Sequence, residues 1–167
     1  LLHLFGAPLP EVFRDALMRP LGAGDDWSWR GYDDAWVDLR GRRVQSVPGG
    51  THWGGGVSIG ARDQARLGQL LLDGGRHGSV QIVPEAWVRF MFEPCAIAPF
   101  YGGLLWLNRD GRSFAGASTG SACMVGAGGH LTWVEPAHDA VVVLRWMDPA
   151  ATAGFTQRMA AGLQAMA

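Results

Sequence analysis

Lysine is absent from the sequence, and all 14 positively charged residues are arginines. The pattern Ser-x-x-Lys, in which a lysine one helical turn after a serine takes the hydroxyl proton, is therefore excluded from these 167 residues. Charge is also scarce, because only 17% of residues are charged and the net charge is −1. We therefore expect neither nucleic acid nor an anionic membrane surface as a partner. No apolar run approaches the roughly 18–20 residues that a membrane span needs.

Cysteine is nearly absent, with only Cys95 and Cys123. Both lie among apolar residues and outside any Cys-x-x-Cys pattern, so we expect two buried thiols rather than a disulfide. His130 and His138 have neither His-Glu-x-x-His spacing nor cysteine ligands beside them, so we predict no metal site and no cofactor. A signal peptide is not predicted either. Because the chain starts at Leu1 instead of methionine, we expect it to be a segment of a longer protein.

Apolar residues are plentiful, at 48% of the chain, which is typical of a packed globular domain. Helices are predicted where apolar residues recur at helical spacing and a glycine or proline marks the end of the segment. The last predicted helix carries Phe155, Met159 and Leu163 on one face. The expected helices cover residues 1–6, 8–18, 58–73, 83–92 (with Pro84 in the first turn) and 149–167. Strands are expected at 101–107, 131–134 and 140–146.

The segment 124–146 predicts an antiparallel hairpin after a glycine-rich bend at 126–129. Residues 131–134 are rich in β-branched and aromatic side chains, as strands are. Residues 135–139 contain Pro and Asp and are predicted to form the turn. The second strand, 140–146, is apolar enough for burial on both faces. Strand, short turn and strand together indicate a hairpin.

Several segments, in this order, resemble the C-terminal half of serine hydrolases related to class C β-lactamases, penicillin-binding DD-peptidases and 6-aminohexanoate-dimer hydrolase. The segments that carry the resemblance are Pro20-Leu21-Gly22, the helix ending at Asp73-Gly74-Gly75, residues 82–88, the 101–107 strand and Glu135-Pro136. The resemblance implies an α+β fold of the β-lactamase/transpeptidase type, with an antiparallel sheet flanked by helices in an α/β/α-like arrangement. Residues 1–167 would be a single, incomplete segment from the C-terminal part of that domain.

The family's third motif, Lys-Thr-Gly or His-x-Gly, lies on the strand that edges the active site. By its position before Glu135-Pro136, this motif falls on Met124, Val125 and Gly126. Its glycine is kept, and its Lys or His is replaced by Met124. By resemblance, the next residue, Ala127, offers a backbone N–H to an oxyanion, a role that needs no particular side chain. The alternative interpretation is an ordinary glycine-rich hairpin.

Two further groups of residues are candidates for the site. The loop 46–56 is rich in glycine and carries His52 and Trp53, which we predict to contact substrate. A glycine-rich connector with a packed tryptophan is the alternative. A catalytic trio of His130, Asp139 and Ser121 is a separate hypothesis, because triad members can occur in any order along a chain.

The resemblance implies part of a serine acyl-hydrolase that works through an acyl-enzyme. The nucleophile's Ser-x-x-Lys and the Tyr-x-Asn motif would lie before Leu1, in the missing N-terminal half of the same domain, which is the expected partner. The substrate would be a small ester, amide or β-lactam-like molecule, and Met124 favours an esterase or amidase over a potent β-lactamase. The 167 residues alone are predicted to be inactive and to expose an apolar patch. A truncated or degenerate module without turnover is the alternative.

Overall fold

A computed structural model describes residues 1–47 and 56–166 of the chain. The chain divides into two compact units, Leu1–Asp63 and Gln64–Ala167, each of which is described by itself. The helix α3, Ala61–Leu72, crosses the boundary between them.

The first unit is small and is built from short elements. They are α1 (Leu2–Phe5), α2 (Leu9–Phe13), a π-helical turn (Arg14–Met18), β1 (Ser28–Trp29), β2 (Trp36–Leu39), β3 (Arg42–Gln45) and β4 (Val57–Ser58). Gly6 ends α1 at φ 65°, as its position in the sequence predicts. Phe13 packs edge-to-face against Trp27 and Trp29, with ring centroids 5.2 and 5.7 Å apart. This aromatic group joins α2 to the segment that enters β1.

The second unit holds the larger sheet. Its elements after α3 are β5 (Arg76–His77), β6 (Val80–Gln81), α4 (Glu85–Met91), β7 (Trp106–Leu107), β8 (Ala122–Gly126), β9 (His130–Glu135), a 3-10 turn (Pro136–His138), β10 (Ala140–Leu144) and α5 (Pro149–Met166). The antiparallel strands follow the order β10-β9-β8-β7. The predicted α+β fold, with an antiparallel sheet flanked by helices, is confirmed.

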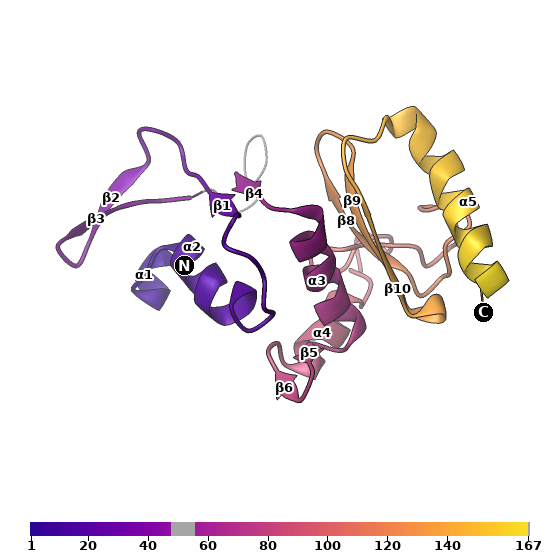
Figure 1. The fold of residues 1–167 in the computed structure, drawn as a ribbon, viewed down its shortest axis with the longest axis horizontal. Helices are drawn as coiled ribbons and strands as arrows, with labels where there is room; N and C mark the ends of the chain where they lie inside the picture. The colour runs from indigo at the N-terminus through magenta and orange to yellow at the C-terminus, as the bar shows by residue number, and fades with distance from the viewer. Residues whose placement is uncertain (48–55, 167) are drawn as a thin grey trace. The chain divides into compact units, whose positions relative to one another are not determined.

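One face of the sheet packs against α5. Buried Cys123, Leu131 and Trp133 form the core on this face together with Leu144. Phe155, Met159 and Leu163 pack against this core from α5, which confirms the predicted stripe. Figure 1 shows α5 running beside β8, β9 and β10.

The opposite face packs closely against α3. A side chain at Gly68 would place its Cβ 2.6 Å from Val141 and 2.9 Å from Thr132, so the helix can approach the sheet only with glycine there. Gln64 Nε2 donates a hydrogen bond to Thr132 Oγ1 at 2.8 Å. The sheet therefore lies between two helices, and this sandwich holds β8 and β9 in place.

Two strand predictions differ from the structure. In the predicted strand 101–107, only Trp106 and Leu107 pair in the sheet, and Tyr101 bridges back to Trp106. The chain bends between them because Gly103 N donates to Met91 O and Leu104 takes φ 65°.

The strand 140–146 is also shorter than predicted. It ends at Leu144, because Trp146 adopts φ 58° and leaves the sheet with 76% of its surface exposed. Both faces of β10 are covered, but it is an edge strand, so its residues 140–143 are half-buried rather than buried.

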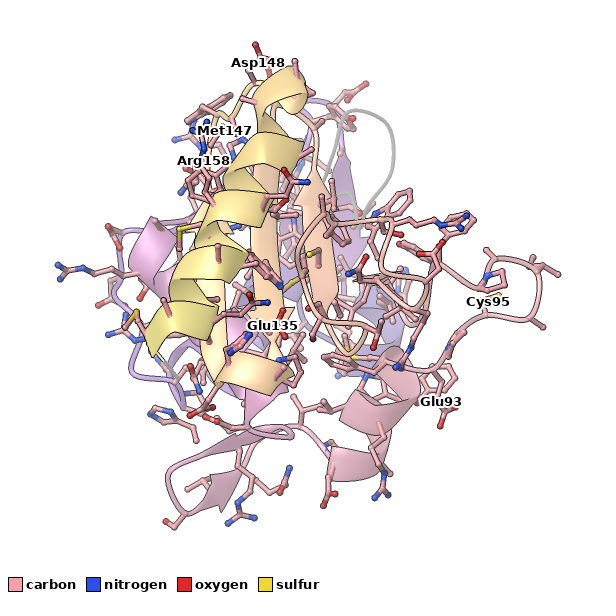
Figure 2. All side chains as sticks on the ribbon, turned by 90° about the vertical axis from the view of Figure 1, so that its right-hand side faces the viewer. Glu93, Cys95, Glu135, Met147, Asp148 and Arg158 are labelled. Carbon is pink, nitrogen blue, oxygen red and sulfur yellow. The ribbon has the colours of Figure 1, made fainter. Side chains whose placement is uncertain are left out.

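Smaller corrections concern α4 and the cysteines. Pro84 is the N-cap of α4 rather than a residue of its first turn. Cys123 is buried, as predicted, but Cys95 is exposed, so the prediction of a buried thiol is wrong there. Figure 2 shows Cys95 on a projecting loop. Pro94 and Pro99 flank Cys95 in the sequence, and proline disfavours regular secondary structure.

Candidate functional site

The end of β8 and the turn after it bring four predicted site residues together. Met124, Val125 and Gly126 are consecutive in β8, and Gly126 pairs with His130 across the hairpin. Residues 127–129 form the turn, in which Gly128 and Gly129 have φ of 85° and 73°. L-residues with a Cβ rarely adopt these angles, so the glycine-rich sequence allows a tight reversal here.

The turn is held against the segment that follows β10. Met147 N donates to Gly129 O at 3.1 Å. A Cβ on Gly129 would lie 1.8 Å from Met147 O, so no side chain fits between the two backbones. Close packing with the backbone at Met147 therefore fixes the position of the turn.

Among the described residues, no strand pairs with the outer edge of β8 at Val125. Asn108 N donates to Ser121 O at 3.1 Å, and Trp106 pairs with Cys123. In an antiparallel ladder the groups that face one neighbour recur at every second residue, so the backbone N–H and C=O of Val125 also point to the β7 side. Within the described chain, β7 pairs only with Ala122 and Cys123 and does not reach Val125.

Ala127 has the same parity as Val125, being two residues further along the chain. If β8 continued in extended form, the N–H of Ala127 would face the same open edge. Ala127 is exposed and lies in the turn. The open edge therefore passes directly into the glycine-rich turn.

Two cavities meet at Val125. One, of about 300 Å³, lies beside the turn and is lined by Val125, Gly126, Ala127, Gly128, Gly129, His130 and residues at the start of α5. The other, of about 290 Å³, is lined by Phe100, Trp106, Ser113, Phe114 and Val125. Val125 is half exposed, and half-buried Met124 packs on the opposite side against the cluster of Leu105, Leu107 and Ala122. Predicted residues His52 and Trp53 lie outside the described residues.

The hypothetical trio of His130, Asp139 and Ser121 is not brought together. Ser121 is buried, and its hydroxyl donates to Glu135 Oε2 at 2.6 Å and accepts from Trp133 Nε1 at 3.2 Å. His130 is the first residue of β9 and Glu135, the partner of Ser121, is the last. Roughly 16 Å of strand therefore separates the backbone at His130 from the end of β9 where Ser121 lies. The His130 ring instead meets Trp146 edge-to-face, with centroids 4.5 Å apart.

Glu135 is the centre of a buried polar cluster that the sequence reasoning missed. Its carboxylate has no exposed surface and accepts from Ser121 Oγ, Ser118 Oγ, Ser118 N at 2.9 Å and Ala137 N at 3.2 Å. Burial alone would raise the pKa of Glu135, but hydrogen bonds from Ser118, Ser121 and Ala137 lower it below the usual value. The cluster joins the loop before β8 to the turn after β9, and we assign it a structural role. Figure 2 shows Glu135 well removed from Met147, which packs on the glycine turn.

Ser118 lies in Gly116-Ala117-Ser118-Thr119-Gly120, which matches the Gly-x-Ser-x-Gly sequence pattern of the nucleophile elbow in α/β-hydrolases. An elbow needs a strand before the serine and a helix after it. Ser118 instead lies in the loop between β7 and β8 and is followed by another strand. Its hydroxyl donates to Glu135, a carboxylate that orients it. The segment 116–120 is therefore not a nucleophile elbow.

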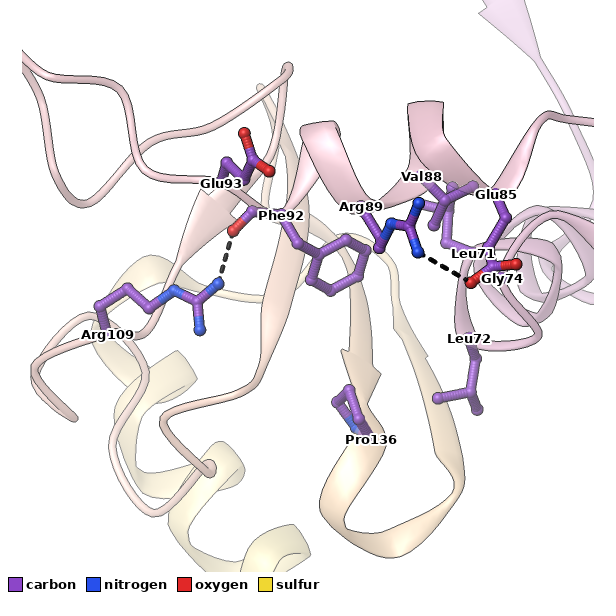
Figure 3. Close-up of a pocket in the computed structure, with 10 residues that line it drawn as sticks. All are labelled: Leu71, Leu72, Gly74, Glu85, Val88, Arg89, Phe92, Glu93, Arg109 and Pro136. Atoms are coloured by element: carbon purple, nitrogen blue, oxygen red, sulfur yellow. Dashed lines mark hydrogen bonds and ion pairs between the residues drawn. The ribbon is translucent and has the colours of Figure 1, made fainter.

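A further cavity, of about 400 Å³, lies at the other end of the hairpin (Figure 3). Leu71, Leu72, Val88, Phe92 and Pro136 form its apolar lining. Arg89 at its rim pairs with Glu85, and Arg109 donates to the carbonyl oxygen of Phe92. Since Pro136 follows the six residues of β9, about 20 Å of strand separates this cavity from the glycine turn. This cavity is therefore distinct from the predicted site.

Across residues 1–47 and 56–166, no group of three or more His, Cys, Asp or Glu side chains could hold a metal ion. Within the same ranges, no helix is both long and apolar enough to cross a membrane.

The sequence of this chain is similar to part of a known hydrolase. The chain is 29% identical, over 110 residues, to 6-aminohexanoate-dimer hydrolase from Paenarthrobacter ureafaciens, an alignment that covers 57% of this chain and 26% of that protein. No protein-family model matches the chain.

The fold of this chain also resembles those of solved structures. Simvastatin synthase from Aspergillus terreus matches 96% of this chain with a TM-score of 0.61 and 18% identity. EstCE1, a hydrolase with promiscuous acyltransferase activity, also matches 96% with a TM-score of 0.61 and 18% identity. This chain covers 50% and 51% of those two proteins. The chain is homologous to 6-aminohexanoate-dimer hydrolase, has the β-lactamase/transpeptidase-like fold, and spans about a quarter to a half of the relatives it matches.

Proposed function

We propose that these residues form the oxyanion side and one pocket wall of a serine acyl-hydrolase, whose nucleophile and base are carried by polypeptide outside the 167 residues. The open edge of β8, which leads directly into the turn at Ala127, is the observation that carries this proposal. Homology to part of a hydrolase supports the proposed reaction class. The absence of lysine from the sequence requires that a Ser-x-x-Lys pair come from elsewhere.

The proposed reaction proceeds through an acyl-enzyme. The serine oxygen bonds to the carbonyl carbon of an ester or amide, while the base takes the hydroxyl proton and transfers it to the departing alcohol or amine. The carbonyl oxygen becomes negative in the intermediate, and the N–H of Ala127 donates to it. The bond to the leaving group breaks, and water then releases the acid by the same steps.

The other predicted residues would shape the substrate side. Gly126 has no side chain, so a substrate can approach the backbone between Val125 and Ala127 closely. Met124 supplies no positive charge for a substrate carboxylate. We therefore propose an esterase or amidase acting on small acyl compounds.

A serine-directed fluorophosphonate tests this proposal. We expect the 167-residue chain alone to hydrolyse neither p-nitrophenyl acetate nor nitrocefin above the buffer rate and to remain unlabelled. The same chain joined to the preceding polypeptide of its reading frame should turn over p-nitrophenyl acetate saturably and carry the phosphonate on a serine of the added part. Labelling of Ser118 or Ser121 would overturn the assignment.

A non-catalytic binding or structural module is the second candidate, because every hydroxyl in the Glu135 cluster is engaged by that carboxylate. It predicts that the longer polypeptide neither hydrolyses p-nitrophenyl acetate nor reacts with the phosphonate.

A further inference from the structure

We propose that the cavity between α3, α4 and the turn after β9 binds a hydrophobic monocarboxylate of about the length of octanoate (Figure 3). The alkyl chain of the ligand would lie among the aliphatic side chains, and its carboxylate would bind the guanidinium group of Arg109. The cavity is distinct from the glycine turn, so this inference goes beyond the proposed reaction and does not depend on it.

Segments that are far apart in the sequence converge on this cavity. The end of α3, one side of α4, the chain after β7 and the turn after β9 all contribute, and the apolar members are Leu71, Leu72, Val88, Phe92 and Pro136. The volume of about 400 Å³ falls within the roughly 300–1,000 Å³ of small-molecule sites. Most of these side chains are aliphatic, and an alkyl chain placed among them is removed from water.

Backbone contacts fix the walls before a ligand arrives. Ile82 N and Val83 N both donate to Gly75 O, at 2.9 and 3.0 Å. A Cβ on Gly75 would lie 2.1 Å from Val83 O, so the turn after α3 packs directly on the segment that enters α4. At the end of α4, Gly103 N donates to Met91 O at 2.9 Å. The helix is therefore held at both ends, and a preformed wall lowers the entropic cost of binding.

The charged groups at the rim favour an anion. Arg89 pairs with Glu85 at 3.3 Å, so these two charges offset each other. Arg109 instead donates to a neutral acceptor, the carbonyl oxygen of Phe92, at 2.5 Å. Figure 3 shows the Glu93 carboxylate on the other side of that carbonyl from Arg109. Among the described lining residues, Arg109 therefore keeps a positive charge with which a ligand carboxylate can pair.

The bond between Arg109 and Phe92 also prepares the site. A guanidinium group is a planar fork of several N–H donors, and the Phe92 carbonyl accepts from one of its terminal nitrogens. That carbonyl lies at the C-terminus of α4, whose partial negative charge would otherwise repel a carboxylate. Because Arg109 is exposed, the ligand carboxylate would stay partly hydrated at the rim, which keeps its desolvation cost small.

Four small probes separate the apolar contact from the charged one: octanoate, octanamide, octylammonium and butyrate. Binding to the whole 167-residue chain is followed by amide shifts in ¹H–¹⁵N NMR, at concentrations where octanoate is monomeric. Thermal unfolding is the second readout, because a ligand that binds the native state raises Tm.

We expect octanoate to shift the amide signals of Leu72, Phe92 and Arg109 and to bind about fivefold tighter than octanamide, with octylammonium weakest. Each fully buried methylene multiplies affinity by a factor of about four, so butyrate should bind at least about tenfold more weakly than octanoate. Equal binding of octanoate and octylammonium, or shifts confined to residues outside the cavity, would overturn the inference.

Arginine variants test the charged contact. Arg109→Gln should weaken octanoate about fivefold and leave octanamide unchanged, and Arg109→Lys should recover most of the loss. Arg112→Gln is the matched control, because it removes the same charge from an exposed residue of the same segment that does not line the cavity. Equal losses of octanoate binding in Arg109→Gln and Arg112→Gln would refute the assigned contact.

Leucine variants test the apolar contact. Leu72→Ala should weaken octanoate and octanamide alike, by about fivefold, because it removes surface on which the alkyl chain lies. Leu104→Ala truncates a leucine that is 80% exposed outside the cavity and should change neither affinity. Equal losses in the two variants would indicate non-specific adsorption and contradict the site. If Leu72→Ala fails to fold by circular dichroism, Leu72→Val replaces it.

The longer polypeptide tests whether the site exists in the whole protein. With the preceding polypeptide of its reading frame attached, the chain should still bind octanoate, and Arg109→Gln should still weaken that binding. Loss of octanoate binding there would mean that the added polypeptide covers the cavity, and the inference would be overturned. Turnover of p-nitrophenyl acetate by the same protein tests the proposed function separately, so either proposal can fail while the other stands.

Discussion

Replacing Glu135 with glutamine tests whether the buried carboxylate holds the hairpin in its sandwich. In the native cluster Oε2 accepts from Ser118 N and Ser121 Oγ, and Oε1 accepts from Ala137 N and Ser118 Oγ. Each carboxylate oxygen therefore faces one backbone N–H. In Glu135→Gln, either orientation of the amide turns an NH₂ group toward a backbone N–H, which leaves two buried donors opposed.

An opposed buried donor costs about 1–3 kcal/mol, and hydrogen bonds to a charged group contribute about 1.5–3 kcal/mol. We therefore expect Glu135→Gln to lower the free energy of unfolding by about 3 kcal/mol. Urea denaturation followed by tryptophan fluorescence measures this change, since buried Trp133 bonds to Ser121 in the same cluster. Glu85→Gln, at an exposed pair with Arg89, is the matched control and should change stability by less than about 1 kcal/mol.

The pH dependence gives the sign of the effect. Hydrogen bonds hold the pKa of Glu135 in the folded protein below its unfolded value, which is near 4.3. The carboxylate therefore contributes stability that is present above the unfolded pKa and is lost as pH falls through the folded pKa. The gap between the parent and Glu135→Gln should narrow over that range. A cost no larger than that of Glu85→Gln, or a gap independent of pH, would refute this account of the cluster.

Two other predictions concern the turn and the thiols. Gly129→Ala should lower the free energy of unfolding by about 3 kcal/mol in urea denaturation, because the new Cβ would meet Met147 O. Gly111→Ala is the control: it carries only the cost of φ 72°, since nothing lies within 4 Å of its Cβ. Equal effects of the two substitutions would contradict close packing at the turn. Ellman's reagent should react with one thiol in the native chain, that of exposed Cys95, and with two thiols after denaturation. Cys123 is protected in the native chain because it is buried, and burial raises the pKa of its thiol. Two fast-reacting thiols in the native chain would show that Cys123 is accessible.

Local patterns predicted the elements whose causes are local. The β-branched run of β9, the proline-containing turn after it and the three-residue stripe of α5 gave the hairpin and the packing of its covering helix correctly. Gly6 marked the end of α1 because the left-handed conformation at that position favours glycine. These features depend on neighbours within a few residues in the sequence.

Features that depend on distant contacts were missed. Leu104 adopts φ 65° because the chain bends over the end of α4, and nothing in a leucine signals that conformation. The role of Ser121 depends on Glu135, 14 residues away, and a serine next to an apolar strand carries no sign of it.

The candidate site remains a prediction, to which the structure adds one feature. The resemblance placed Met124, Val125, Gly126 and Ala127 along one segment, and the structure adds that the edge beside Val125 is open. The edge is open because β7 has only two residues, Trp106 and Leu107, whereas the sequence pattern predicted a strand over 101–107. The strand is shorter because the chain bends tightly at Gly102 and Gly103, where it packs on the end of α4.

The most direct test of the central claim is the rate of the longer polypeptide when the backbone N–H at position 127 is removed. Ala127→Pro deletes that donor, and Ala127→Ser keeps it while changing the side chain. Loss of one oxyanion donor lowers kcat by roughly 10²–10³. With p-nitrophenyl acetate, the account predicts a loss of this size in Ala127→Pro and a rate close to the parent in Ala127→Ser, with both variants folded by circular dichroism. Equal rates in the two variants would contradict the claim that this turn stabilises the oxyanion.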